Sequence, residues 1–275
     1  MKQLEALNVM RELKLNNSFE DRNLTELQKL PSYSGVWNLT FQNKEFMMLN
    51  IKNDDGIPLK YFWRNGYEKY SLDVWYKITN THSLCIDVGA HSGIYSIIGN
   101  LHKNNNIISI EPYYLNYVRL LDNLKLNSIP INLCFMAAAS NFTGTCKFDV
   151  KVTGYHANGG KISKDGNIIT SSIELDKMNI KSDVSGIKID TEGNEFEVLE
   201  GAKNIIDKYK PHIILEYNTS SFKKCKNFLV DLGYSYFYID DNKKLLIKDI
   251  DNLDTEPDSE GKNYLFSSRI EELSL

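Results

Sequence analysis

Hydrophobic residues change their spacing along the chain near residue 81. Up to residue 30 they recur every three or four positions, which predicts two short amphipathic helices, the second ended by Pro31. Short apolar runs follow and predict strands at 36–41, 46–51 and 59–63. We expect residues 1–65 to form an N-terminal cap of helices and short strands.

From residue 81 onward, apolar runs alternate with amphipathic segments. The runs predict core strands at 84–88, 107–110, 131–136, 186–189 and 212–215. Helical spacing is clear at Tyr117, Leu120, Leu121 and Leu124, and again at Val198, Ala202, Ile205 and Tyr209. Apolar strands separated by helices are typical of a mostly parallel sheet covered on both faces. Residues 66–275 are therefore predicted to form one α/β domain.

An insert interrupts this alternation at residues 147–173. Within it, Asp165-Gly166 between Ile162 and Ile168 predicts a tight hairpin. The preceding GYHANGG segment, 154–160, is rich in glycine and predicts a mobile loop. Near the end of the chain, the acidic stretch 249–261 predicts a strand edge or a tail.

Composition is that of an ordinary globular protein, with 42% hydrophobic and 25% charged residues among 275. The net charge of −4 and the lack of a long basic run argue against a nucleic-acid partner. No apolar run approaches the roughly 20 residues that span a bilayer, and the charged N-terminal segment does not resemble a signal peptide. Four cysteines without C-x-x-C spacing indicate free thiols. We therefore expect a cytoplasmic protein.

The segment CIDVGAHSGIYS, residues 85–96, joins the first core strand to a helix. It places Asp87, Gly89 and Gly93 at the carboxyl end of that strand, where parallel sheets bind ligands. Glycines let the backbone approach a ligand closely, and the following helix offers free N–H groups. Glu111 ends the next strand, where a carboxylate commonly binds both ribose hydroxyls of an adenosine.

The spacing of the glycines bears on which adenosine cofactor binds there. A dinucleotide turn needs G-x-G-x-x-G, because the pyrophosphate sits against the start of the helix. This turn has G-x-x-x-G, preceded by Asp87. A carboxylate suits a cofactor with ammonium and sulfonium charges better than one with phosphates. The turn therefore favours S-adenosylmethionine, while a dinucleotide and a cofactor-free scaffold stay open as alternatives.

Four segments together resemble the FkbM family of S-adenosylmethionine-dependent methyltransferases. They are CIDVGAHSGIYS, IEPYYLNYVRLLDNLKLN, GIKIDTEGNEFEVLEGA and PHIILEYN. The resemblance runs from about Tyr67 to Gly233 and implies a class I methyltransferase (Rossmann-like) fold, with a seven-stranded, mostly parallel sheet ending in a reversed hairpin. It also implies O-methyl transfer, often to sugars or glycosylated products. The chain departs from the family at His91 and Thr191, where Asn and a β-branched apolar residue are usual.

Carried over by position, the resemblance implies a cofactor site along the first three core strands. Asp87, Gly89 and Gly93 would line the methionine and ribose side, Glu111 would hold the ribose, and the small Ala137-Ala138 pair would border adenine. Glu68 would reach the amino-acid part, with a solvated helix position as its alternative. The predicted set is Glu68, Asp87, Gly89, Ala90, His91, Gly93, Glu111, Pro112, Ala137 and Ala138.

Candidate catalytic groups lie at the ends of the fourth and fifth core strands. Methyl transfer to a hydroxyl needs a group that removes or stabilises its proton, and neighbouring parallel strands end side by side. The candidates are Asp190, Glu192 and Glu216, together with His156 from the insert. Glu192 has an alternative role beside the helix dipole, and His156 an alternative as an ordinary loop residue. Asp190, Glu216 and Asn218 could also bind Mg²⁺, as in catechol-type methyltransferases.

These residues predict an O-methyltransferase whose acceptor is a hydroxyl of a sugar, a glycan or a glycosylated small molecule. The alternatives are an N-methyltransferase, an NAD-dependent oxidoreductase, or a cofactor-binding module without catalysis. The last would not need the three strand-end acids. We expect the cap and the insert to shape the acceptor pocket.

Overall fold

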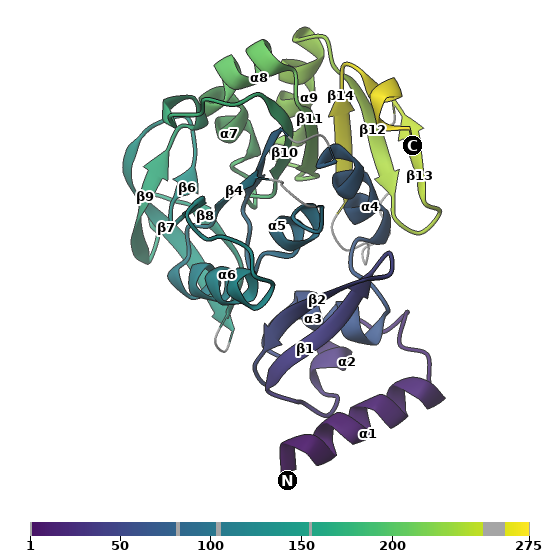
Figure 1. Ribbon diagram of the computed structural model, residues 1–275. Helices are drawn as coiled ribbons and strands as arrows, with labels where there is room; N and C mark the ends of the chain where they lie inside the picture. Colours follow the sequence, from purple (N-terminus) through teal and green to yellow (C-terminus); the bar gives the residue numbers. More distant parts are fainter. Residues whose placement is uncertain (1, 81–82, 103–105, 154–155, 250–261, 275) are drawn as a thin grey trace.

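The computed structural model describes residues 2–80, 83–102, 106–153, 156–249 and 262–274 (Figure 1). The cap consists of helices α1 (Lys2–Asn16) and α2 (Leu24–Gln28), the hairpin of β1 (Gly35–Phe41) and β2 (Lys44–Asn50), and helix α3 (Gly56–Trp63). The two predicted helices and the first two predicted strands are confirmed. The strand predicted at 59–63 is wrong, because that segment belongs to α3.

Helix α3 forms because a capping residue precedes its aromatic run. The Asp55 side chain accepts a hydrogen bond from the Ile57 N–H at 2.9 Å and begins the helix. Pro58 lies in the first turn, where its missing N–H is not needed. Tyr61 and Trp63 are buried against the cap core. The aromatic residues predicted a strand by propensity alone. The N-cap at Asp55 and the packing of Tyr61 and Trp63 stabilise a helix instead.

The central sheet contains eight strands in the order β13-β12-β14-β11-β10-β3-β4-β5. Their bounds are β3 (Leu84–Val88), β4 (Asn106–Ile110), β5 (Cys134–Phe135), β10 (Val184–Ile189), β11 (His212–Glu216), β12 (Ser235–Asp240), β13 (Leu245–Lys248) and β14 (Asn263–Ser267). Strands β5, β4, β3, β10 and β11 are parallel to one another. Strand β14 is antiparallel to β11, β12 is antiparallel to β14, and β13 is antiparallel to β12. The predicted class I arrangement is confirmed. The sheet exceeds the expected seven strands by the edge strand β13.

Helices cover both faces of this sheet (Figure 1). One face carries α4 (Lys69–Ile78), α5 (Ile94–Gly99) and α6 (Tyr114–Leu126), the other α7 (Glu195–Gly201), α8 (Lys203–Tyr209) and α9 (Phe222–Asp231). Each face has its own hydrophobic cluster, and the cap shares the cluster of α4 and α5. Short 3-10 turns occupy Leu175–Lys177 and Ile270–Leu273.

The helix expected through Ala202 is divided into α7 and α8. The α-carbon of Gly201 lies so close to the preceding sheet that a Cβ would stand 2.0 Å from the Ser140 carbonyl oxygen. Helix α8 then begins anew, and the Asp176 carboxylate accepts the N–H groups of Asn204 and Ile205. The predicted apolar face is retained, because Val198, Ala202 and Ile205 are all buried.

The predicted insert, together with the residues from 138 that precede it, forms a second sheet whose described strands have the order β6-β9-β7-β8. Its strands are β6 (Ala138–Ala139), β7 (Gly144–Thr153), β8 (His156–Ile162) and β9 (Ile168–Ile173). The predicted tight hairpin is wrong, because the turn at Asp165-Gly166 passes across β7. Ile162 and Ile168 therefore both pair with Phe148 instead of with each other.

The loop predicted at 154–160 is also largely wrong, because residues 156–160 belong to β8. Residues 154–155 lie outside the described residues, as does nearly all of the acidic stretch 249–261. The third core strand is shorter than predicted, with only Cys134–Phe135 paired in the sheet.

Two asparagines, one in the last turns of α6 and one directly after it, hold the cap against the main domain. Asn127 accepts from the Met47 N–H and donates to the Met47 carbonyl, so it pairs with β2 as another strand would. Asn123 accepts from the Leu49 N–H at 2.7 Å, and its amide also donates to the Ser92 carbonyl in the predicted cofactor turn. These contacts give hydrogen-bond partners to backbone groups of Met47 and Leu49 on the open edge of β2. They also fix the cap next to the predicted cofactor turn.

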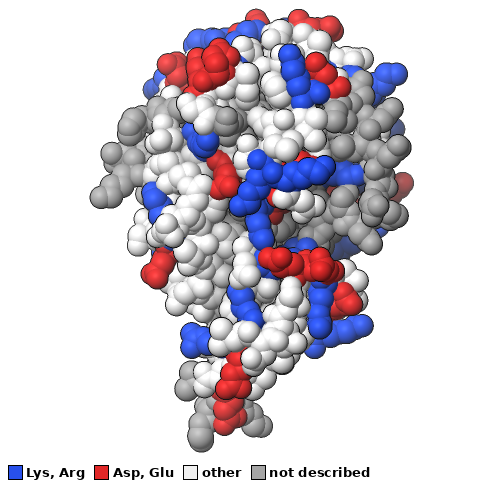
Figure 2. All heavy atoms as spheres, turned by 90° about the vertical axis from the view of Figure 1, so that its right-hand side faces the viewer, with Lys and Arg blue, Asp and Glu red and all other residues white. Residues whose placement is uncertain are grey.

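The surface agrees with the composition. On the face drawn in Figure 2, Lys and Arg side chains are interspersed with Asp and Glu side chains and do not form one basic patch. Within the described ranges, no helix combines the length and the apolar character needed to cross a membrane.

Candidate active site

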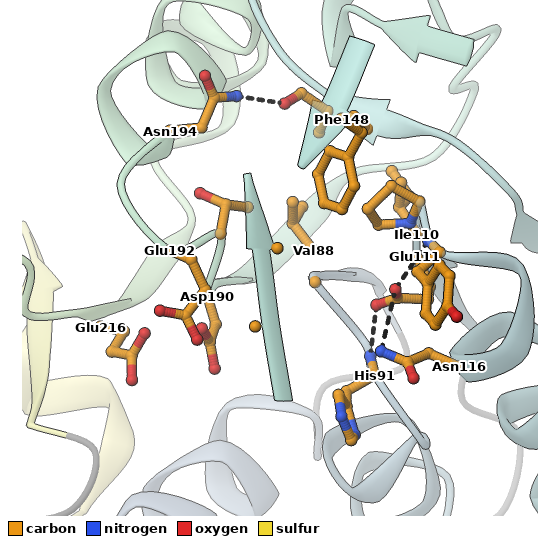
Figure 3. A pocket seen from close by; sticks show the side chains of 18 of the residues that line it. Val88, His91, Ile110, Glu111, Asn116, Phe148, Asp190, Glu192, Asn194 and Glu216 are labelled. Carbon is orange, nitrogen blue, oxygen red and sulfur yellow. Dashed lines mark hydrogen bonds between the residues drawn. The ribbon is translucent and has the colours of Figure 1, made fainter. Parts of the chain in front are cut away.

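A pocket opens over the carboxyl ends of β3, β4, β10 and β11 (Figure 3). The cap contributes Ile57 and Lys60 to its wall, and β8 of the insert contributes Gly159 and Gly160. The cap and the insert therefore border the same pocket as the strand ends. In Figure 3, Glu111 and His91 lie at one end, and Asp190, Glu192 and Glu216 lie at the other.

The glycine turn forms the floor between these two ends. Gly89 has a φ of +76°, and a Cβ at this position would stand 1.7 Å from the Asp190 carbonyl oxygen. Only glycine permits this approach of the two strand ends. His91 also adopts a positive φ, of 50°. This conformation turns the His91 N–H toward the end of β4, where it meets Glu111 at 2.9 Å.

Glu111 is held mainly by backbone groups. One carboxylate oxygen accepts the His91 N–H, and the other accepts the Tyr113 N–H at 3.0 Å and, at 3.5 Å, the Asn116 side-chain amide. The side chain is 5% exposed and lines the pocket, and burial raises its pKa. Each carboxylate oxygen can accept more than one hydrogen bond. The oxygen that accepts only the His91 N–H can therefore receive a further donor, such as a hydroxyl of a ligand.

The predicted cofactor residues divide into two groups in the structure. The residues that line the pocket are Gly89, His91, Glu111, Pro112, Ala137 and Ala138. Asp87, Ala90, Gly93 and Glu68 are not among the lining residues. Gly93 instead precedes α5 with a φ of +95°, packed against Leu120.

Asp87 lies beneath the turn. Its carboxylate is 1% exposed and accepts a hydrogen bond from the Ser96 hydroxyl. Burial raises the pKa of Asp87 to about 6, although Ser96 and Lys188 lower it. Asp87 therefore shapes the turn and its electrostatic potential from below.

Glu68 likewise turns away from the pocket. Its Oε2 accepts from the Tyr95 hydroxyl at 2.5 Å and from the Asn263 amide at 2.8 Å. The residue before it, Tyr67, lines the pocket in its place. Burial, followed by the charge of Glu68, raises the pKa of Tyr67 well above its usual value. The phenol therefore stays protonated, and its hydroxyl is hydrogen-bonded to Glu68.

Three of the predicted catalytic acids converge. Carboxylate oxygens of Asp190, Glu192 and Glu216 all lie within 4.8 Å of one another. Asp190 follows β10, and its N–H donates to the Val88 carbonyl next to the glycine turn. Glu216 ends the neighbouring strand β11. Their convergence follows from the pairing of β10 with both β3 and β11.

Asp190 and Glu216 have opposite protonation tendencies. Burial opposes the charge of Asp190, but the Lys188 ammonium and a hydrogen bond from Glu216 outweigh it and lower the pKa of Asp190. Burial and the nearby Asp190 charge raise the pKa of Glu216 well above its usual value. The pair therefore holds one proton on Glu216 and leaves Asp190 ionised, which is the form that can accept a proton.

The alternative role considered for Glu192 belongs to another residue. Glu195 is fully buried and accepts the Thr191 and Gly193 N–H groups at the start of α7. Glu192 instead has a positive φ of 55° and points toward Gly159 of the insert. Its carboxylate is therefore available at the mouth of the pocket.

Two further candidates are placed less favourably. The Asn218 side-chain oxygen accepts both the N–H and the hydroxyl of Ser220, and Asn218 does not line the pocket. It does not fit the Mg²⁺ set that the sequence suggested, and the three carboxylates are the groups brought together instead. His156 belongs to β8, and its side chain lies outside the described part of the chain.

Sequence reasoning missed several residues of the site. Lys188, beneath the acids, carried a readable signal, because a lysine within an apolar strand needs a buried partner. Tyr113 and Phe148 line the pocket without such a signal. Lys60 reaches the pocket from the cap, which is remote in sequence.

Comparison with known proteins gives one family. The family model described as the methyltransferase FkbM domain matches residues 87–236, more than half of the chain. No curated protein sequence matches.

Among solved structures, the FkbM methyltransferase from Methylobacillus flagellatus has 17% identity and a TM-score of 0.47, with 78% of this chain and 54% of that one covered. The chain thus spans about half the length of that protein. The precorrin-6y C5,15-methyltransferase from Geobacter metallireducens has 17% identity and a TM-score of 0.40, with coverages of 73% and 87%. A putative methyltransferase from Streptococcus mutans in complex with SAH has 9% identity and a TM-score of 0.44, with coverages of 72% and 94%.

The family match begins at Asp87, takes in the glycine turn, Glu111 and the acids that end β10 and β11, and stops within β12. This chain belongs to the FkbM methyltransferase family.

Proposed function

We propose that this protein is an S-adenosylmethionine-dependent O-methyltransferase that acts on a hydroxyl of a sugar, a glycan or a glycosylated metabolite. The observation that carries the proposal is one pocket with Glu111 at one end and ionised Asp190 at the other. Glu111 can accept a hydrogen bond from a ribose hydroxyl, and Asp190 can accept the proton of an acceptor hydroxyl.

The cofactor end supports an adenosine. Glu111 can accept a further hydroxyl donor on the oxygen that binds the His91 N–H, and the small side chains of Ala137 and Ala138 leave room for a flat ring beside Tyr113. The glycine turn joins the two ends, because His91 donates to Glu111 and Gly89 lies against the Asp190 carbonyl oxygen, and the amino-acid part of the cofactor would rest there. S-adenosylmethionine would supply a methyl group on a sulfonium, which is reactive toward an oxygen nucleophile.

The acid end supports the acceptor step. Asp190 is ionised and lines the pocket, so it can accept the proton of an acceptor hydroxyl as the oxygen attacks. Glu216 stays protonated and orients Asp190 through their hydrogen bond. Tyr67 and Glu192 border the same space and can hold neighbouring hydroxyls of the acceptor. Positioning supplies much of the rate in such an in-line transfer.

Calorimetry tests the cofactor. We expect binding of S-adenosylmethionine and S-adenosylhomocysteine and none of NAD, because the turn lacks the glycine spacing for a pyrophosphate. NAD binding without S-adenosylmethionine binding would overturn the proposal in favour of an oxidoreductase.

A screen of radiolabelled methyl transfer onto sugars, glycans and glycosylated small molecules tests the acceptor. Amines belong in the same screen, because the ionised Asp190, with Glu192 and Glu216 within 4.8 Å, also attracts a cationic acceptor. Transfer to amines alone would establish an N-methyltransferase. We expect transfer to hydroxyls, and we expect it to persist in EDTA, since Asn218 does not complete a Mg²⁺ site.

A further inference from the structure

Lys188 is a charged residue in the middle of a buried strand. It is 1% exposed in β10, whose every position is buried. An ammonium group in such a place is strongly unfavourable unless oppositely charged groups surround it. The negatively charged groups that stabilise this buried ammonium must therefore be among its neighbours.

The neighbours of Lys188 are the acids of the active site. The ammonium nitrogen lies 3.5 Å from an Asp190 carboxylate oxygen and 4.9 Å from the centre of the Tyr95 ring. Tyr95 in turn donates to Glu68, so the ammonium has negative groups on two sides. Burial opposes its charge, yet Asp190, Glu68 and Glu216 outweigh burial and raise the pKa of Lys188.

Lys188 does not line the pocket, whereas Asp190 and Glu216 do. The ammonium therefore approaches the carboxylates from the side away from the ligand. A divalent ion bound by the same three acids would add a second cation beside it. Mg²⁺ also demands near-octahedral oxygen ligands, and the amide oxygen of Asn218 is already taken by Ser220.

We propose that the buried ammonium of Lys188 is the resident cation of the Asp190–Glu192–Glu216 cluster, and that it positions Asp190 toward the acceptor without a divalent metal ion. Lys188 is then a positioning residue that acts through Asp190. The inference rests on the proposed function only in assigning Asp190 to the acceptor step, and its test needs no acceptor.

The test is a titration with Mn²⁺ at neutral pH, followed by electron paramagnetic resonance of the free ion. The variants are Lys188→Met, which removes the charge but keeps an unbranched side chain, and Lys188→Arg, which keeps the charge. Lys203→Met on the exposed surface of α8 removes the same charge elsewhere and serves as the matched control. Lys188→Gln is a second uncharged variant should the Met variant fail to fold.

We expect wild type, Lys188→Arg and Lys203→Met to leave Mn²⁺ free up to about millimolar concentration. The uncharged Lys188 variant should bind Mn²⁺ at least about tenfold more tightly, because the ionised Asp190 and the acids beside it have lost their cation. Adding Asp190→Asn should remove this gain and so locate the ion. A merely structural lysine would change stability without creating an ion site.

Two results would overturn the inference. One is tight Mn²⁺ binding by wild type that Asp190→Asn abolishes, and the other is no gain in a folded, uncharged Lys188 variant. Calorimetry with S-adenosylhomocysteine on wild type keeps the two proposals apart. Wild type that binds both S-adenosylhomocysteine and Mn²⁺ overturns only the role of Lys188, whereas wild type that binds neither overturns only the cofactor assignment.

Discussion

The two ends of the pocket hold their carboxylates by different means. At the Glu111 end, proposed for the cofactor, the carboxylate oxygens accept N–H groups from the backbone of His91 and Tyr113. At the Asp190 end, proposed for the acceptor, Asp190 is held by the side chains of Lys188 and Glu216. Backbone donors survive most side-chain substitutions, whereas side-chain partners do not. The Glu111 end should therefore tolerate sequence change better than the Asp190 end.

The sharpest test of this contrast is Asp190→Asn, which removes the proposed proton acceptor but keeps its shape. We expect methyl transfer to fall by about 10²–10⁴-fold, while the affinity for S-adenosylhomocysteine changes little. The measurement is the turnover number with the acceptor from the screen, beside calorimetry. Near-normal turnover of the folded variant would place the chemistry elsewhere.

The next largest effect is expected on stability, at Gly89, where the glycine turn contacts the backbone of Asp190. Gly89→Ala combines a positive φ with a Cβ only 1.7 Å from the Asp190 carbonyl oxygen. We expect the free energy of unfolding to drop by about 3 kcal/mol or more, from backbone strain and overpacking together. Urea denaturation measures it.

Gly233→Ala is the matched control for this substitution. Gly233 has a φ of +88°, but a Cβ there meets nothing within 4 Å. It should lose only the strain of the left-handed conformation, about 1 kcal/mol. Equal losses at the two positions would show that the close approach of β3 and β10 is not what requires Gly89.

Asp87 lies beneath the turn and predicts a pH dependence of stability. Burial raises the pKa of Asp87 to about 6 in the folded protein, against 3.8 for the free side chain. Between these values the folded protein binds the proton more tightly, so the contribution of Asp87 to the free energy of unfolding falls as pH rises. The fall amounts to about 3 kcal/mol at most.

Asp87→Asn should therefore flatten the pH profile of urea unfolding between about pH 4 and 6. Asn can still accept the hydrogen bond from Ser96. Asp165→Asn, on an exposed turn, is the control and should leave the profile unchanged. An unchanged profile for Asp87→Asn would show that this carboxyl titrates normally despite its burial.

The smallest of these effects is expected at the backbone-held end. Glu111→Gln keeps one acceptor oxygen but loses charge-assisted hydrogen bonds to the ribose, each worth about 1.5–3 kcal/mol. We expect S-adenosylhomocysteine to bind roughly 10–100-fold more weakly. The His91 and Tyr113 N–H groups bind different carboxylate oxygens, so in Gln one of them keeps an oxygen partner and the other meets the amide NH2 group. Urea denaturation of the variant separates this structural loss from the loss of ligand contacts. Calorimetry showing full affinity would remove Glu111 from the cofactor site.

Local pattern was sufficient for much of the fold and for part of the site. The apolar runs of β3, β4, β10 and β11 are readable because both faces of a parallel sheet are buried. Strand ends then place Gly89, Glu111, Asp190 and Glu216 on one edge of the sheet. Aromatic content alone misassigned α3, because an N-cap and cap packing overrode propensity.

The insert shows a different limit of sequence reasoning. The Asp165-Gly166 signal indicated a turn, and a turn is present, but the pairing partner of the flanking residues is Phe148 on a strand earlier in the chain. A turn signal contains no information about which strand comes between its two arms.

The amino-acid sequence by itself determined the parallel core, the glycine turn and the acids at the strand ends, since each depends on residues near in sequence. Only the tertiary structure decided what each carboxylate does. Asp87 and Glu68 point into buried partners, Glu111 and Asp190 face the pocket, and Lys188 approaches from below. The reason is that the protonation and direction of a buried charge depend on neighbours from several elements, and folding alone brings these together.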